Sequence, residues 1–145
     1  MTCFTIGLAL LLSLLGMPSI EGSEDMTVTF VNGAPSGDEI RGRACGPSLI
    51  FPGDKPNPLC LGLPDNAMII YPDVIDGPKY ADGDDFMFRY WLADTLGHEP
   101  CHFHSGLNLS GKTNWERSRE ARCYVIGQNY AWEMVRQDKA ARGGK

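Results

Sequence analysis

The spacing of apolar residues predicts two short strands in the first half of the chain. β-Branched and apolar residues alternate from Thr27 to Val31 (TVTFV), a pattern typical of a half-buried strand. A continuous apolar run from Ala67 to Tyr71 (AMIIY) has the length of a fully buried strand, and Pro72 ends it. Residues 32–66 hold most of the prolines and many glycines, so we expect long loops between the two strands.

The second half of the chain shows the longer period of helices. Asp84 or Asp85 can cap a helix that is apolar over most of its surface as far as Gly97, which predicts a core helix. A second helix is expected from about Asn114 to Gln137. Gly127 lies inside it and costs about 1 kcal/mol relative to alanine. The buried stripe expected on this helix consists of Cys123, Ile126, Tyr130 and Met134.

The first 22 residues have the pattern of a secretory signal peptide. Phe4 to Gly16 is an apolar run too short to cross a membrane, and a polar stretch with a cleavage point after Gly22 follows it. No later apolar run is long enough to span a bilayer. We therefore expect a secreted, extracellular protein in which residues 23–145 form a single domain.

The charge balance limits the classes of partner. The formal net charge is −5, and cleavage after Gly22 would remove Glu21, which leaves −4. An acidic chain without a basic cluster argues against nucleic acid or an anionic membrane as the main partner. We expect a monomer that acts on, or binds, a protein or peptide.

The cysteine count predicts two disulfide bonds. Cys3 leaves with the signal peptide, and an even number of cysteines remains in an oxidising compartment. Because glycines and prolines make the interval after Cys45 rich in turns, a local bridge would order it. We therefore favour the pairs Cys45–Cys60 and Cys101–Cys123. Asn108 begins an N-x-S sequon, which predicts glycosylation of an exposed loop.

Residues 97–115 contain two functional signatures. Gly106 to Thr113 (GLNLSGKT) fits the phosphate-binding loop of nucleotide hydrolases, and His98 to His102 (HEPCH) fits H-E-x-x-H. A phosphate-binding loop needs a parallel strand before it and further strands that carry a magnesium ligand. Only 145 − 113 = 32 residues follow Thr113, mostly one predicted helix. We interpret the loop signature as an exposed turn.

The H-E-x-x-H signature places chemistry on one helical face. Residues four apart on a helix share a face, so His98 and His102 could bind one zinc ion while Glu99 activates a water. Pro100 opposes this reading, because proline inside a helix costs about 3 kcal/mol. A helix that stops near Gly97 would instead leave the histidines in an ordinary turn. The sequence leaves both alternatives open.

A family resemblance favours the zinc reading. The stretches "TLGHEPCHF" and "GQNYAWEM" resemble the fungal deuterolysin-like and lysine-specific metallopeptidases, the aspzincins, and "NAMIIYPD" looks like the edge strand that these enzymes place before the zinc helix. The resemblance covers about residues 66–134. It implies a zincin-like α+β fold, in which a short sheet packs on a core helix carrying HEPCH and on a C-terminal helix. It also implies zinc as cofactor, with His98 and His102 as ligands and Glu99 as general base.

The third zinc ligand of that family has no counterpart here. Aspzincins take it from an aspartate shortly after the second histidine, and the segment from Phe103 to Cys123 contains no aspartate. Glu116, Glu120 and His104 are candidates for a substitute. We therefore expect either a secreted zinc endopeptidase or a degenerate zincin-like relative.

Other functions use the same residues. The main alternative is a non-enzymatic, disulfide-stapled secreted effector that binds a host protein. A secreted nuclease would use a histidine, a glutamate such as Glu99 or Glu116, and Arg117 or Arg119. Cys101 could be a further metal ligand, although export favours its oxidation. Four aromatic residues could stack on carbohydrate, but their helical spacing favours the core: Trp115, Tyr124, Tyr130 and Trp132.

Overall fold

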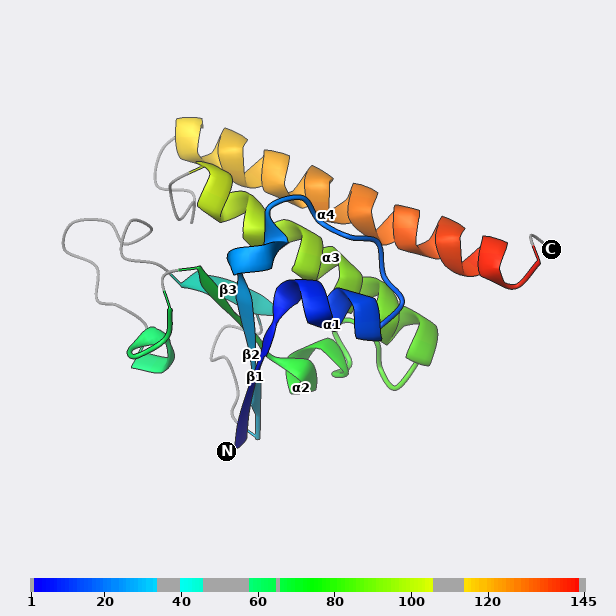
Figure 1. The fold of residues 1–145 in the computed structure, drawn as a ribbon, viewed down its shortest axis with the longest axis horizontal. Helices are drawn as coiled ribbons and strands as arrows, with labels where there is room; N and C mark the ends of the chain where they lie inside the picture. Colours follow the sequence, from blue (N-terminus) through cyan, green and yellow to red (C-terminus); the bar gives the residue numbers. More distant parts are fainter. Residues whose placement is uncertain (1, 34–39, 46–57, 65, 106–113, 144–145) are drawn as a thin grey trace.

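The computed structural model describes residues 2–33, 40–45, 58–64, 66–105 and 114–143 of the chain, and its side chains at 104, 105 and 114–120 are not described. The fold is α+β (Figure 1). In chain order the strands and helices are β1 (Thr2–Gly7), α1 (Leu8–Leu14), β2 (Thr27–Asn32), β3 (Gly42–Cys45), β4 (Ala67–Ile70), α2 (Pro72–Ile75), α3 (Asp85–Ser105) and α4 (Asn114–Ala141), with short 3-10 turns at Ser23–Asp25 and Pro58–Cys60.

The described strands form one mixed sheet with the order β1-β2-β4-β3. β1 and β2 are antiparallel, β2 and β4 are parallel, and β3 and β4 are antiparallel. The two strands predicted from the sequence are confirmed as β2 and β4. The expectation that β4 is an edge strand is wrong, because β4 pairs on both sides and all four of its residues are buried. β3 borders it, inside the stretch where only loops were expected.

Alternation along the strands divides the apolar residues between two faces of the sheet. Val28, Met68 and Ile70 face the main core, which also contains residues of α1, α3 and α4. Val31, Ile69 and other residues face a smaller cluster on the opposite side. β4 contributes to both clusters, which explains why its sequence is a continuous apolar run and not an alternating one.

The N-terminal apolar run is packed into the main core. Leu8 and Leu12 of α1 are fully buried there, and β1 pairs with β2 over its whole length. Beyond α1, Arg89 donates a hydrogen bond to the carbonyl oxygen of Leu15, and the Tyr130 hydroxyl donates one to that of Pro18. Cleavage after Gly22 remains a prediction. In the described parts of the chain, no helix combines the length and hydropathy needed to span a membrane.

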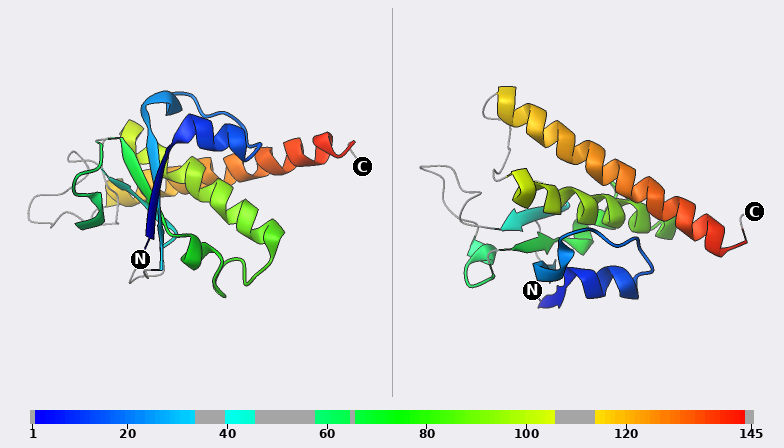
Figure 2. Two further views of the ribbon diagram at one scale, coloured as in Figure 1. Left: turned by 60° about the horizontal axis from the view of Figure 1, so that its bottom comes forward. Right: turned by 45° about the horizontal axis from the view of Figure 1, so that its top comes forward.

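The long helices α3 and α4 pack side by side and antiparallel, with α3 between α4 and the sheet (Figures 1 and 2). The buried stripe of α4 differs in part from the expected one, because Ile126 is exposed while Gly127 and Ala131 are buried. The close approach of α4 to α3 explains why glycine and alanine, and not Ile126, lie on the buried face. A Cβ atom on Gly97 would lie 2.7 Å from the Cβ of Tyr130, so only a glycine fits there.

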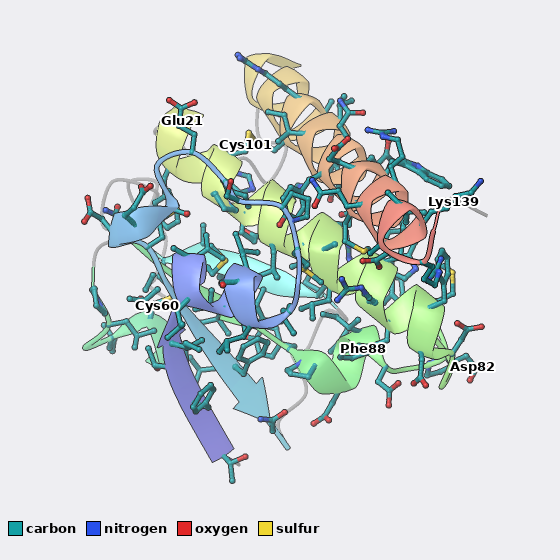
Figure 3. All side chains as sticks on the ribbon, turned by 45° about the vertical axis from the view of Figure 1, so that its right-hand side comes forward. Glu21, Cys60, Asp82, Phe88, Cys101 and Lys139 are labelled. Carbon is teal, nitrogen blue, oxygen red and sulfur yellow. A yellow bond between two sulfur atoms is a disulfide. The ribbon has the colours of Figure 1, made fainter. Side chains whose placement is uncertain are left out.

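Both predicted disulfide pairs are present, Cys45–Cys60 and Cys101–Cys123. The first joins β3 to the 3-10 turn at Pro58–Cys60. The second joins α3 to α4, close to the end of α3 where Figure 3 labels Cys101. Cys3 is a free, exposed cysteine of β1.

Candidate metal centre

Helix α3 carries the H-E-x-x-H signature within its regular structure. Asp84 caps the helix, since its Oδ1 accepts a hydrogen bond of 2.9 Å from the backbone N–H of Met87. The helix continues through Pro100 and ends at Ser105. The alternative in which the helix stops near Gly97 is therefore wrong, and HEPCH occupies consecutive helical positions.

The two histidines of the signature converge. The Nε2 atoms of His98 and His102 lie 3.1 Å apart. Two nitrogens at this separation can each lie about 2.0 to 2.1 Å from a common point and subtend about 100° there, close to the tetrahedral angle of about 109° preferred by zinc. The same separation suits a hydrogen bond from one ring to the other, which a bound ion would replace.

Glu99 completes a buried group of three side chains of the kinds that can bind metal ions. One carboxylate oxygen lies 3.9 Å from Nε2 of His98, and the other lies 4.0 Å from Nε2 of His102. All three residues are buried, with 5 or 6% of their surface exposed. Their ligand atoms lie within 4.8 Å of one another, so the group could hold a metal ion.

A buried ion pair lies one helical turn before His98. Asp94 is 1% exposed, and its Oδ1 accepts a hydrogen bond of 2.9 Å from Nη1 of Arg41. The guanidinium also lies over two aromatic rings, 4.7 Å from the centroid of Trp91 and 5.1 Å from that of Tyr80. A buried carboxylate without a partner would be strongly unfavourable. The pairing with Arg41 therefore allows Asp94 to be buried on the same face of α3 as His98 and His102.

Helix α4 closes over this line at a glycine and a tyrosine. A Cβ on Gly127 would lie 2.6 Å from the carbonyl oxygen of Asp94 and 3.0 Å from the Cβ of His98. One turn earlier on α4, the Tyr124 ring lies 4.5 Å from the His98 ring, centroid to centroid. Glycine is unfavourable inside a helix, but at position 127 its lack of a side chain allows α4 to pack closely against His98.

The Cys101–Cys123 disulfide offsets the cost of Pro100. It closes a loop of 22 residues, for which chain entropy predicts about 3 kcal/mol of stabilisation. Proline inside a helix costs about the same. Because the Cys101 sulfur is bonded to that of Cys123, Cys101 is a structural residue here and not a metal ligand.

Several predicted site residues lie outside the part of the chain that is described. These are Asn108, the Gly106 to Thr113 loop, and the side chains of His104, Trp115, Glu116, Arg117, Arg119 and Glu120. Of the aromatic set, Tyr130 packs against the core, whereas Tyr124 and Trp132 are 48% and 52% exposed. The core expectation thus holds for Tyr130 alone among the described members.

Sequence reasoning missed the contributions of Asp94, Arg41 and Tyr124 to the surroundings of the motif. A signal for Asp94 was present, because Asp94, His98 and His102 follow one another at intervals of four, the spacing of one helical face. No comparable signal points to Arg41, which is 53 residues away from Asp94 along the chain.

Comparisons of the chain with protein families, with curated proteins and with solved structures found no match.

Proposed function

We propose that this protein is a secreted, zinc-dependent endopeptidase with a zincin-like arrangement of its metal helix. The observation that carries the proposal is the 3.1 Å separation of the His98 and His102 Nε2 atoms, with the Glu99 carboxylate within 4.0 Å of both. Zinc fits two imidazole nitrogens and a carboxylate environment in a tetrahedral site.

Bound zinc would supply Lewis acidity, polarising a water and the carbonyl of the substrate. The chain itself supplies the rest. His98 and His102 would hold the ion, and the helix backbone keeps their rings on one face. Glu99 accepts the proton of the attacking water and passes it to the leaving amine, which is general base and then general acid catalysis. Its burial beside the imidazoles excludes competing solvent.

Export is part of the proposal. The N-terminal run with its cleavage point after Gly22 favours secretion, and the two disulfides are compatible with an oxidising compartment. The Asn108 sequon would then be glycosylated. A protein or peptide is the substrate that this zinc chemistry suits.

Cleavage of casein by the zinc-loaded protein tests the activity. Glu99→Gln keeps the size of the side chain and removes its basicity, so we expect cleavage to fall by at least about 100-fold. Glu133→Gln is the matched control, because Glu133 lies on the exposed side of α4 and pairs with Arg136. Equal cleavage by wild type and Glu99→Gln would refute the peptidase proposal.

A binding protein is the second candidate. Helix α4 exposes large apolar side chains, with Tyr124, Val125 and Trp132 each about half exposed, at 48, 53 and 52%, and the Tyr124 ring lies against His98. Such residues are enriched where proteins bind one another. In this reading the protein is a secreted effector for a host protein, and the metal helix is a retained scaffold. Zinc binding without any cleavage would favour it.

A further inference from the structure

His98 contacts two other aromatic rings, one from each of the long helices. On its own helix, the centroid of the His102 ring is 5.0 Å away, and the two ring planes are inclined at 67°. From α4, the centroid of the Tyr124 ring is 4.5 Å away, with the planes inclined at 54°. The ring contacts therefore connect α3 to α4, and His98 lies in the middle.

The Tyr124 side chain belongs to the surface more than to the core. It is 48% exposed, whereas His98 beside it is 5% exposed. In the described parts of the chain, neither core cluster includes Tyr124. Its ring nevertheless lies against a buried imidazole. Tyr124 therefore helps to cover His98 while half of its own surface remains open to solvent.

The backbone on both sides of Tyr124 is held against α3. Cys123 is fully buried and bonded to Cys101. Three residues after Tyr124, a Cβ on Gly127 would lie only 3.0 Å from the Cβ of His98. Tyrosine also loses little conformational freedom when it is ordered, because its side chain has only two dihedral angles. The Tyr124 ring is thus attached to a segment that cannot move away from His98.

We propose that Tyr124 is a positioning residue for the metal centre, which holds the His98 imidazole in the orientation that directs its Nε2 toward His102. The inference rests on the proposed function, since it concerns the same zinc centre. Rotation of an imidazole about its Cβ–Cγ bond has broad minima, and rotation of His98 would separate the Nε2 atoms that now lie 3.1 Å apart. Contact with the Tyr124 ring restricts this rotation, so the ligand is preorganised before an ion binds.

Zinc affinity of the full-length protein, measured by competition with a chromophoric chelator, tests this role. Tyr124→Ala removes the ring, so we expect zinc affinity to fall about tenfold, at the low end of the range for residues that surround the ligands of a metal site. Tyr124→Phe keeps the ring and should bind zinc like wild type. Trp132→Ala is the matched control, because Trp132 is 52% exposed on the same helix and its ring packs on Tyr90.

A second measurement does not depend on zinc. In the metal-free protein, the ring current of Tyr124 should displace the imidazole proton resonances of His98 in the NMR spectrum. We expect these resonances to move in Tyr124→Ala and to stay in place in Trp132→Ala. Thermal melting of the same metal-free proteins separates positioning from folding, because the loss of either half-exposed ring should lower Tm to a similar extent.

The outcomes separate this inference from the proposed function. Zinc binding by Tyr124→Ala as tight as that of wild type would overturn the role of Tyr124 and leave the zinc centre standing. Equal losses of affinity in Tyr124→Ala and Trp132→Ala would also overturn it, since they would reflect a general loosening of α4. So would a loss in Tyr124→Phe as large as that in Tyr124→Ala. Wild type that binds no zinc would overturn the proposed function itself, and the inference with it.

Discussion

The Nε2 atoms of His98 and His102 lie 3.1 Å apart although Pro100 stands between the two residues. The helix passes through the proline because the fold holds it on both sides. Asp84 caps its beginning, and the Cys101–Cys123 bridge ties its last turns to α4. The convergence of the two imidazoles therefore depends on tertiary contacts that compensate for an unfavourable local residue.

Replacing the helical proline should stabilise the protein. Pro100→Ala restores the N–H that donates to the carbonyl of Leu96 and removes the ring's clash with that carbonyl, together about 3 kcal/mol. Loss of the packing of the buried Pro100 ring offsets part of this gain. We expect the free energy of unfolding in urea to rise by about 1 to 2 kcal/mol, with zinc affinity unchanged. A lower free energy of unfolding would show that the proline is required for packing.

Adding a side chain at Gly127 should destabilise the protein. A Cβ there would lie 2.6 Å from a backbone oxygen of α3, and overpacking of this kind costs about 1 to 3 kcal/mol. Alanine gains about 1 kcal/mol of helix propensity over glycine, so the expected net loss is up to about 2 kcal/mol. Gln128→Ala, at the adjacent exposed position of α4, is the control. Stabilisation by Gly127→Ala would contradict the close approach of the helices.

The two disulfides should differ in their effect on the metal centre. Replacing Cys101 and Cys123 together by serine should lower the free energy of unfolding by about 3 kcal/mol, and it should weaken zinc binding because this bridge holds α4 beside the histidines. Replacing Cys45 and Cys60 should lower stability by a similar amount and leave zinc affinity unchanged. If both double variants bind zinc like wild type, α4 does not contribute to the site.

Acid should weaken the contact between α3 and the end of α4. The hydrogen bonds from Arg89 hold the pKa of Asp138 below its usual range. A lowered folded-state pKa means that the stabilisation is present above the unfolded value, near about 3.9, and is lost as the pH falls through the folded value. Because the pair is partly exposed, its contribution should be less than about 1 kcal/mol.

Urea denaturation at a series of pH values tests the contribution of the Arg89–Asp138 pair to stability. Asp138→Asn should be less stable than wild type at neutral pH, and the difference should disappear once the pH falls well below about 4. A difference that stays constant down to pH 2 would mean that Asp138 contributes through its size and not its charge.

The apolar pattern was sufficient for the elements that bury a continuous or periodic surface. β2, β4 and the two long helices were predicted because their side chains reflect burial on one or both faces. β3 could not be predicted, since Gly42 to Cys45 has little apolar character and becomes a strand only through pairing with β4. Its glycine is required, because a Cβ there would lie 2.8 Å from Thr95.

The candidate site was predictable to the extent that it is local. His98, Glu99 and His102 form one helical motif, so their spacing alone indicated a shared face. Because of Pro100, the sequence did not determine whether the helix continues through the motif. The contacts that hold the helix there come from α4, the disulfide and the Arg41–Asp94 pair. Those contacts join residues far apart in sequence, which no pattern of a single segment encodes.

The content of zinc per chain is the most direct test of the central claim, that His98 and His102 bind one ion together. Protein purified with both disulfides intact, loaded with zinc and passed through a desalting column, should retain about one equivalent by elemental analysis. His98→Ala and His102→Ala should each retain almost none, while Glu133→Gln should retain as much as wild type. Wild-type protein without bound zinc, or a histidine variant that keeps a full equivalent, would contradict the account.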